Sequence, residues 1–372
     1  MATSDSPLSV PDVTLTVARQ AGGGSPVSGF TAETGFTLLD NGDGTLTITD
    51  SQSRFGTKPN AAKPVWFFDF GSGSDQPHPT LSRQQKTVVW NSASGTSSAI
   101  TKGDAASSVK MDVVVGGKGT ESVFDGDDDK TLTLPANAGR KYFRYLDIYN
   151  DFTQPDLNNR ISSVTGGTYT SVNLKANRWQ SQNAQTTPYT PNVYQGGSYR
   201  FLWLGDSGGQ YDTVMYDLGS RWATKQWEIQ EEYHEVSSAA GATDANMYCV
   251  LDGMQVATRL NKDSHNGLDP SDPLYRWDHF KLANFEVWAD PGYAPWYSNV
   301  LYVDDSWCRV YITDKPTWIN SEVRALEIQI PLGWAAAQID FQQRVGALGS
   351  FPGKYLWVAD NDDNKILIGG WV

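Results

Sequence analysis

Apolar and polar residues alternate with a period of two along most of this chain. Residues 13–17, 46–49 and 226–236 show the alternation clearly. Because successive side chains of a β-strand point to opposite faces, this period predicts half-buried strands. No stretch keeps apolar residues at positions i, i+3, i+4 and i+7 over three turns, so we expect no long helix. The pattern therefore predicts an all-β protein.

Short turn sequences separate many of these strands. Asp-Asn-Gly-Asp-Gly at residues 40–44 follows one apolar run and precedes another, and Asp252-Gly253 lies between residues 247–251 and 254–258. Asn, Asp and Gly tolerate the positive φ angles that tight hairpin loops need. Both segments therefore predict β-hairpins.

Turn and proline positions divide the chain into three predicted units. Residues 1–62 are expected to form a small N-terminal β module. Residues 63–315 carry longer strands with closely spaced turns, which is typical of a large two-sheet sandwich. Residues 316–372, which begin at a proline, are expected to form a small C-terminal β module.

Composition narrows the classes of partner. The chain has 372 residues and a formal net charge of −13, which disfavours nucleic acid and anionic membrane surfaces as partners. The first ten residues lack the basic start and apolar core of a signal peptide, and no apolar run is long enough to span a bilayer. Cys249 and Cys308 lie in strand-like apolar runs, which favours buried free thiols over a single disulfide.

Two segments resemble known families. W-E-I-Q-E-E-Y-H-E-V at residues 227–236, with the Asp-Gly hairpin that follows and L-Y-V-D-D at 301–305, resembles concanavalin A-like (laminin G/jelly-roll) sandwiches over about residues 63–315. I-Q-I-P-L-G-W at 328–334 and the segment 354–364 are similar to small immunoglobulin-like modules of bacterial and phage surface proteins. The resemblance implies a jelly-roll sandwich with an immunoglobulin-like C-terminal module. Lectins, carbohydrate-binding modules, polysaccharide lyases, glycosidases and virion components share this large fold, so it does not settle the function.

Serine and carboxylate motifs give weak indications of catalysis. G-D-S-G-G at residues 205–209 matches a serine-nucleophile motif, but no helix pattern follows Ser207, which favours a glycine-rich loop. Four glutamates lie on one predicted strand, and i, i+4 neighbours on a strand are about 13 Å apart, too far for a glycosidase pair. A solvated strand face is the favoured interpretation of Glu228, Glu231, Glu232 and Glu235.

A polysaccharide lyase is the expected activity if the chain is an enzyme. Such an enzyme needs an acid, a base and a group that neutralises the uronate carboxylate. Tyr233 and His234 are adjacent and point to opposite faces, so His234 is left to pair with a tyrosine of a neighbouring strand, such as Tyr248. Lys175 or Arg178 would neutralise the substrate. These five residues are the candidate catalytic set.

Clusters of hard oxygen ligands suggest a structural calcium ion. Asp125, Asp127 and Asp129 lie in D-G-D-D-D, and residues 360–363 form a second acidic cluster. Carboxylate oxygens suit Ca²⁺, but Asp and Asn also form ordinary turns. Both interpretations stay open.

Aromatic residues gather in polar, glycine-rich stretches, and exposed rings of this kind suit stacking on sugars. The candidate glycan-binding residues are Trp179, Trp203, Tyr211, Tyr293 and Trp296. Packing of the aromatic rings in the core or against loops is the favoured interpretation, and a binding surface is the alternative.

Taken together, the sequence predicts a non-catalytic structural or recognition protein of a surface or particle. A capsid-decorating or tail protein of a phage virion with glycan binding fits best, and a polysaccharide lyase or glycosidase is the alternative. The expected partners are further copies of the chain, other particle proteins and polysaccharide. The expected location is the virion or the cell exterior.

Overall fold

A computed structural model describes the fold. The described residues are 24–56, 65–69, 93–97, 108–111, 115–116, 131–133, 140–149, 173–180, 190–194, 198–203, 206–207, 210–211, 214–219, 227–235, 237–239, 242–251, 253–262, 279–287, 296–304, 306–318 and 325–372. Apart from one 3₁₀ helix at Gly346–Leu348, the regular elements in these ranges are β-strands, which confirms the all-β prediction. Within these ranges, no helix is long and apolar enough to cross a membrane.

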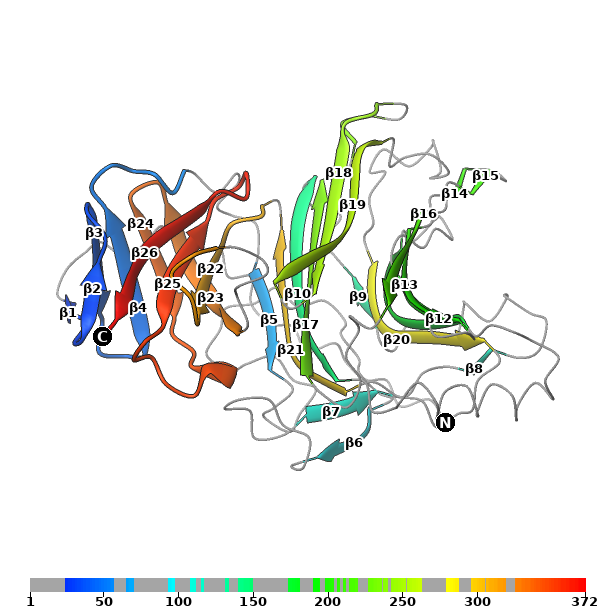
Figure 1. Ribbon diagram of the computed structural model, residues 1–372, viewed down its shortest axis with the longest axis horizontal. Coiled ribbons are helices and arrows are strands. Elements are labelled where there is room, and N and C mark those ends of the chain that lie inside the picture. The colour runs from blue at the N-terminus through cyan, green and yellow to red at the C-terminus, as the bar shows by residue number, and fades with distance from the viewer. Residues whose placement is uncertain are drawn as a thin grey trace, which may run out of the picture.

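The first sheet contains nine strands and pairs residues 25–50 with residues 309–371 (Figure 1). Its order is β1-β3-β4-β24-β23-β22-β25-β26-β2, and its pairs are antiparallel. The strands are β1 (Ser25–Pro26), β2 (Phe30–Ala32), β3 (Phe36–Asp40), β4 (Thr45–Asp50), β22 (Arg309–Thr313), β23 (Leu326–Ala335), β24 (Gln338–Gln342), β25 (Tyr355–Ala359) and β26 (Lys365–Trp371).

This sheet takes strands from all three predicted units. Ile48 of β4 lies opposite Ile339 of β24, and Phe30 of β2 lies opposite Trp371 of β26. Strand β22, which belongs to the predicted unit 63–315, lies between β23 and β25. The division at residues 62/63 and 315/316 stays a prediction, because sheet pairing alone does not define domain boundaries.

The second sheet contains eight antiparallel strands in the order β19-β18-β17-β10-β21-β7-β6, with β5 also paired to β21. They are β5 (Val65–Asp69), β6 (Ala93–Ser97), β7 (Ser108–Met111), β10 (Lys141–Tyr149), β17 (Trp227–Glu235), β18 (Ala245–Leu251), β19 (Met254–Lys262) and β21 (Trp296–Asp304).

Three smaller sheets complete the described strands. One pairs β11 (Asn173–Gln180), β8 (Val115–Gly116) and β9 (Thr131–Thr133) with β20 (His279–Val287). Another has the order β12 (Thr190–Tyr194), β13 (Ser198–Trp203) and β16 (Val214–Gly219). The third joins β14 (Asp206–Ser207) to β15 (Gln210–Tyr211).

Both predicted hairpins are confirmed. Strands β3 and β4 pair antiparallel with Leu38 opposite Ile48, and β18 pairs with β19 across the turn at Gly253. Gly253 has a φ of +76°, which explains why the turn uses glycine.

Strand β22 is buried on both faces and separates two apolar clusters. Val310 and Ile312 face the interior of the nine-stranded sheet, whereas Tyr311 faces the eight-stranded sheet. The latter cluster, here called the interface core, contains Phe143, Tyr145, Ile229, Tyr233, Leu301, Val303, Trp307, Tyr311, Leu326, Ile328, Ile330, Trp357 and Ala359. Each large apolar side chain buried there stabilises the fold by about 1.5–3 kcal/mol, so this cluster holds the two sheets together.

The two cysteines do not form a disulfide. Cys249 and Cys308 are both free and buried. The prediction of buried free thiols is therefore confirmed.

Candidate functional site

Strand β17 presents polar side chains on both of its faces. The register with β10 and β18 places Glu231 and Tyr233 on the face toward the nine-stranded sheet. By alternation, Glu232 and His234 lie on the opposite face. All four side chains are buried.

The expectation of a solvated glutamate face is wrong for three of the four glutamates. Glu228 is 1% exposed, and Glu231 and Glu232 are 0% exposed. A buried carboxylate must be paired or hydrogen-bonded to be tolerated. Glu231 and Glu232 each have one partner on another strand, Tyr311 and Arg144, which the local sequence pattern did not show.

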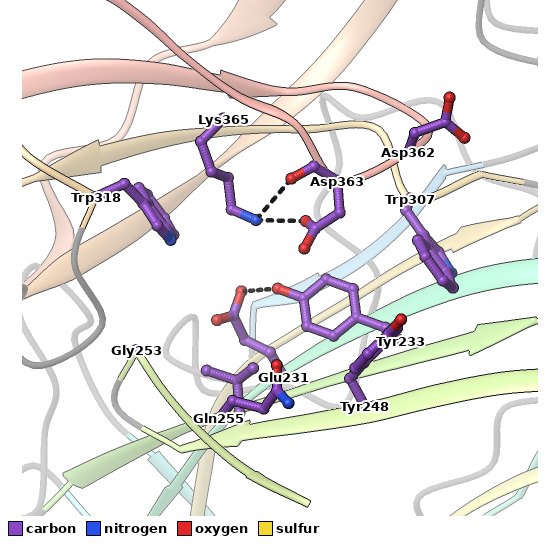
Figure 2. Close-up of a pocket in the computed structure, with 11 residues that line it drawn as sticks. Glu231, Tyr233, Tyr248, Gly253, Gln255, Trp307, Trp318, Asp362, Asp363 and Lys365 are labelled. Carbon is purple, nitrogen blue, oxygen red and sulfur yellow. Dashed lines mark hydrogen bonds and ion pairs between the residues drawn. The ribbon is translucent and has the colours of Figure 1, made fainter. Parts of the chain in front are cut away.

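A pocket of about 230 Å³ lies between the β17–β19 strands and the turn that joins β25 to β26 (Figure 2). Strand β17 contributes two residues, the β18–β19 hairpin contributes four, and the segments flanking β22 contribute one tryptophan each. The β25–β26 turn and the first residue of β26 contribute the rest. The lining residues are Glu231, Tyr233, Tyr248, Val250, Gly253, Gln255, Trp307, Trp318, Asp362, Asp363 and Lys365.

Glu231 is held at the base of this pocket by two tyrosines. Its Oε1 accepts hydrogen bonds from the hydroxyl groups of Tyr233, at 3.2 Å, and Tyr311. Its Oε2 is buried and makes no hydrogen bond with any residue that the structure describes. Burial raises the pKa of Glu231, although the Arg309 charge and the Tyr311 hydrogen bond oppose this rise. This oxygen is therefore a buried acceptor whose hydrogen-bonding capacity is unused among the described residues.

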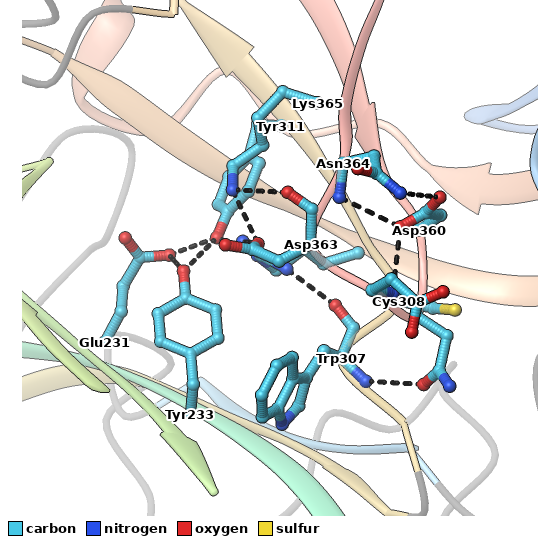
Figure 3. A network of polar contacts seen from close by, with 12 residues as sticks. Glu231, Tyr233, Trp307, Cys308, Tyr311, Asp360, Asp363, Asn364 and Lys365 are labelled. Carbon is cyan, nitrogen blue, oxygen red and sulfur yellow. Dashed lines mark hydrogen bonds and ion pairs between the residues drawn. The ribbon is translucent and has the colours of Figure 1, made fainter. Parts of the chain in front are cut away.

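A second group of charges joins the β25–β26 turn to β22 (Figure 3). The buried Arg309 side chain donates to the Asp363 carboxylate, to the Trp307 carbonyl oxygen at 2.7 Å, and to the Tyr311 hydroxyl. Lys365 Nζ donates to Asp363 Oδ1 at 2.5 Å and to the Asp363 carbonyl oxygen at 3.0 Å. Asp363 therefore binds two cations at once.

These contacts shift the protonation equilibria of both residues. Burial raises the pKa of Asp363, but Arg309 and Lys365 outweigh it and lower the pKa below 3.8. Burial, aided by the Arg309 charge, lowers the pKa of Lys365 to about 8. Both groups are charged at neutral pH.

The acidic cluster at residues 360–363 forms a turn. Asp360 Oδ1 accepts hydrogen bonds from the backbone amides of Asp362 and Asn364, at 2.8 and 2.9 Å. Asp363 has a φ of +65°, which Asp tolerates better than most residues. In the described part of the chain, no group of three or more potential metal-ligating side chains occurs. Asp125, Asp127 and Asp129 lie outside the described residues, so a structural calcium ion there stays a prediction.

The opposite face of β17 carries a separate polar cluster. Glu232 accepts hydrogen bonds from Arg144 and from Gln230 Nε2, the latter at 2.5 Å. His234 Nε2 lies 3.4 Å from Glu232 Oε2. Burial lowers the pKa of His234 to about 4, which makes the imidazole neutral at pH 7.

The structure brings together only two of the candidate catalytic residues. Tyr233 and Tyr248 lie opposite each other in the register, and their ring centroids are 6.4 Å apart in an edge-to-face arrangement. His234 lies opposite Met247 and on the other face of the sheet. The pairing of His234 with Tyr248 is therefore not formed. Lys175 and Arg178 lie on β11, in a different sheet.

The candidate glycan-binding residues are dispersed over several strands. Trp179 lies on β11, Trp203 on β13, Tyr211 on β15 and Trp296 on β21. Tyr293 lies outside the described residues. The role of these residues in glycan binding stays a prediction.

Sequence reasoning missed the residues that complete the pocket. Trp307, Trp318 and Lys365 carried no recognised motif, and Asp363 was considered only as a calcium ligand. The sequence D-N-D-D-N does indicate a turn. The position of this turn beside β17, however, depends on the long-range pairing of β25 with β22.

Comparisons with known proteins give little guidance. No protein-family model and no curated protein matches this chain. A solved endo-β-1,4-glucuronan lyase from the fungus Trichoderma reesei aligns with a TM-score of 0.35 and 11% identity, covering 60% of this chain and 99% of the lyase. A PL-14 alginate lyase from Aplysia kurodai gives 0.34 and 11%, covering 57% and 87%. The CBM40 of the Ruminococcus gnavus IT-sialidase, bound to α2,3 sialyllactose, gives 0.25 and 6%, covering 44% and 76%. Similarities at this level establish neither the family nor the function of this chain.

Proposed function

We propose that this protein is a non-catalytic recognition protein that binds a saccharide in the pocket between its two large sheets. The observation that carries the proposal is the pairing of aromatic walls with hydrogen-bonding groups in one pocket. The volume of about 230 Å³ lies below the range of drug-sized sites. It suits one sugar residue at the end of a chain.

The aromatic side chains supply flat apolar surfaces. Trp318 and Tyr248 are partly exposed at the pocket, and Trp307 lies beside Tyr248 with ring centroids 5.7 Å apart. Sugar rings have apolar C–H faces that pack on such rings, and the polar edges of Trp and Tyr tolerate water nearby.

Polar groups on the other walls match sugar hydroxyls. Glu231 Oε2 accepts hydrogen bonds, Lys365 donates them, and the Gln255 amide at the rim does both. Asp363 is bound to two cations, which favours a fixed structural role over proton transfer. Recognition therefore explains the pocket better than hydrolysis does.

We also propose the fold family, the location and the partners that the sequence predicts. The large sheets would belong to a concanavalin A-like jelly roll, with an immunoglobulin-like C-terminal module. The chain would act on a virion or at the cell exterior, where copies of itself or other particle proteins would be its partners. Light scattering with and without Ca²⁺ tests this part, because a stable multimer supports it and a 40.9 kDa monomer counts against it.

Calorimetry with a panel of mono- and oligosaccharides tests the binding site. We expect Trp318→Ala to weaken binding at least tenfold and Trp318→Phe to retain most of it, because the stacking surface is kept. Thermal melting of each variant separates loss of binding from loss of fold. If wild-type protein binds no saccharide in the panel, the proposed function is wrong.

A second candidate function is elimination on an acidic polysaccharide at the opposite face of β17. The buried Arg144, Glu232 and His234 lie together there. A lyase needs a cation beside the uronate carboxylate and a base that removes the neighbouring proton. Release of unsaturated products by wild-type protein but not by His234→Gln would support it. No product from any uronate polymer would exclude it.

A further inference from the structure

We propose that the pocket selects neutral saccharides and discriminates against both acidic and amino sugars. This inference rests on the proposed function, because it concerns the ligand of the same pocket. The observations behind it are the balance of charges at the pocket and the buried, unpartnered Oε2 of Glu231.

The buried charges beside the pocket sum to zero. Glu231 and Asp363 line the pocket, as does Lys365. Arg309 lies directly behind them, because it donates to Asp363 and, through its Nε, to the Tyr311 hydroxyl that donates to Glu231. With Glu231 ionised, two carboxylates and two cations give a net charge of 2 − 2 = 0.

The charges at the rim of the pocket are in contact with solvent. Asp362 lines the rim with a side chain that is 78% exposed, and Lys141 Nζ lies 3.4 Å from its Oδ1 and 4.0 Å from Glu235 Oε1. Solvent screens an exposed pair of this kind. The charges at the rim therefore change the electrostatic potential inside the pocket only slightly.

Glu231 is the buried charged residue to which the ligand would hydrogen-bond. Its side chain is 0% exposed, its Oε1 accepts from two tyrosines, and its Oε2 has no donor among the described residues. A buried acceptor without a donor is unfavourable. A neutral hydroxyl supplies the missing hydrogen bond and leaves the charge balance unchanged.

A charged ligand would disturb the balance in either direction. A carboxylate or an ammonium group in the pocket would leave one uncompensated charge in a medium of low effective dielectric constant, which is costly. Because the two signs of buried charge are balanced, they attract and repel such a ligand about equally and do not repay the cost of removing its charge from water. We expect neutral sugars to bind at least about tenfold more tightly than their uronate or amino counterparts.

The structure supplies two substitutions that should change this selectivity. Glu231→Gln keeps an oxygen that accepts from Tyr233 and Tyr311 and places an amide NH₂ where Oε2 was, so the buried group gains a net positive charge. Lys365→Met keeps the length of the stem beside Trp318, whose ring lies 5.3 Å from Nζ, and gives a net negative charge. The first variant should favour uronates, and the second should favour amino sugars.

The test compares matched methyl glycosides at pH 7 by calorimetry. For glucose, galactose and mannose, the neutral sugar, its uronate and its 2-amino form are measured against wild-type protein, both variants and a control. Glu235→Gln is the control, because Glu235 lies on the same strand and bonds to Asn246 Nδ2 at 3.1 Å but does not line the pocket.

Each outcome has one meaning. Tighter binding of neutral sugars to wild type and to Glu235→Gln, with opposite shifts of at least tenfold in the two pocket variants, supports the inference. If neutral and charged sugars bind wild type equally, or the variants keep its selectivity, the inference is wrong while saccharide recognition stands. If no sugar binds any form, the proposed function itself fails.

Discussion

Replacing Asp363 by Asn removes the charge that holds two cations at the junction of the sheets. The side chains of Arg309 and Lys365 are 0% and 16% exposed, and that of Asp363 is 37% exposed. Asn keeps the size of the side chain and one carbonyl oxygen. The perturbation is therefore electrostatic, and Arg309 is left with hydrogen bonds to Trp307 and Tyr311 but without its carboxylate.

The expected loss lies between two limits. Breaking a fully buried ion pair costs about 3–5 kcal/mol, whereas an exposed pair contributes at most about 1 kcal/mol. Arg309 is fully buried but Asp363 is partly in contact with solvent, which screens the pair. We therefore expect Asp363→Asn to lower the free energy of unfolding by about 2–3 kcal/mol at pH 7.

Equilibrium unfolding in guanidinium chloride measures this loss. Asp362→Asn is the matched control, because the neighbouring Asp362 is 78% exposed and pairs with Lys141 at the surface, and its loss should stay below about 1 kcal/mol. Since the folded state lowers the pKa of Asp363, the stability that this carboxylate provides is present above pH 3.8 and is lost as the pH falls through its folded pKa. The gap between wild type and Asp363→Asn should therefore close in acid. Equal losses for the two variants at pH 7 would refute the reasoning.

Three further variants test other parts of the structure. The pKa of Lys365 is about 8 in the folded protein and 10.5 ordinarily, so the unfolded chain binds more protons between these values. The free energy of unfolding of wild type should therefore rise by about 3 kcal/mol relative to that of Lys365→Met from pH 8 to 10.5. A constant difference between the two proteins contradicts this. The pKa of His234 is about 4 in the folded protein and 6.5 ordinarily. The free energy of unfolding of wild type should therefore fall by up to about 3 kcal/mol relative to that of His234→Gln as the pH falls from 6.5 to 4. Parallel plots of this free energy against pH count against a buried neutral imidazole. Gly369→Ala places a Cβ 2.2 Å from the Thr31 carbonyl oxygen at a φ of +154° and should cost at least about 1–3 kcal/mol, with faster amide exchange in β2. Gly353→Ala, whose Cβ meets nothing within 4 Å at a φ of +75°, controls for backbone strain, and an equal loss there would show that the clash is absent.

The sequence predicted the strands and hairpins because residues close together in the chain determine them. The period-two alternation in residues 45–50 and the Asn-Gly and Asp-Gly turn before it act within one hairpin. The pairing of β4 with β24 has no such local cause. Thr47 donates to Asp340 Oδ1 at 2.6 Å across 293 residues of sequence, and an alternating strand can pair with many others. For this reason the pairing of residues 25–50 with residues 309–371 in one sheet could not be predicted from the sequence.

The pocket could not be predicted either, because it also depends on long-range contacts. A glutamate in an alternating strand indicates a solvated face unless its partners are known. One partner of Glu231, Tyr233, lies two residues away on the same strand, but the other, Tyr311, is 80 residues away. Tyr233 and Tyr248 were identified as candidate residues, and the structure does bring them together. Their neighbours in the pocket, however, depend on how the β25–β26 turn meets β17.

The buried charges at this junction argue for a role beyond stability. The interface core already supplies thirteen buried residues between the two sheets. Well-packed apolar residues often stabilise such a position as much as a buried ion pair, or more. The ions here also leave Glu231 with an unpartnered oxygen at the pocket, which an apolar junction would avoid. We infer that the charges are kept because they fix the β25–β26 turn against β17 in one arrangement, and this arrangement gives the pocket its hydrogen-bonding groups.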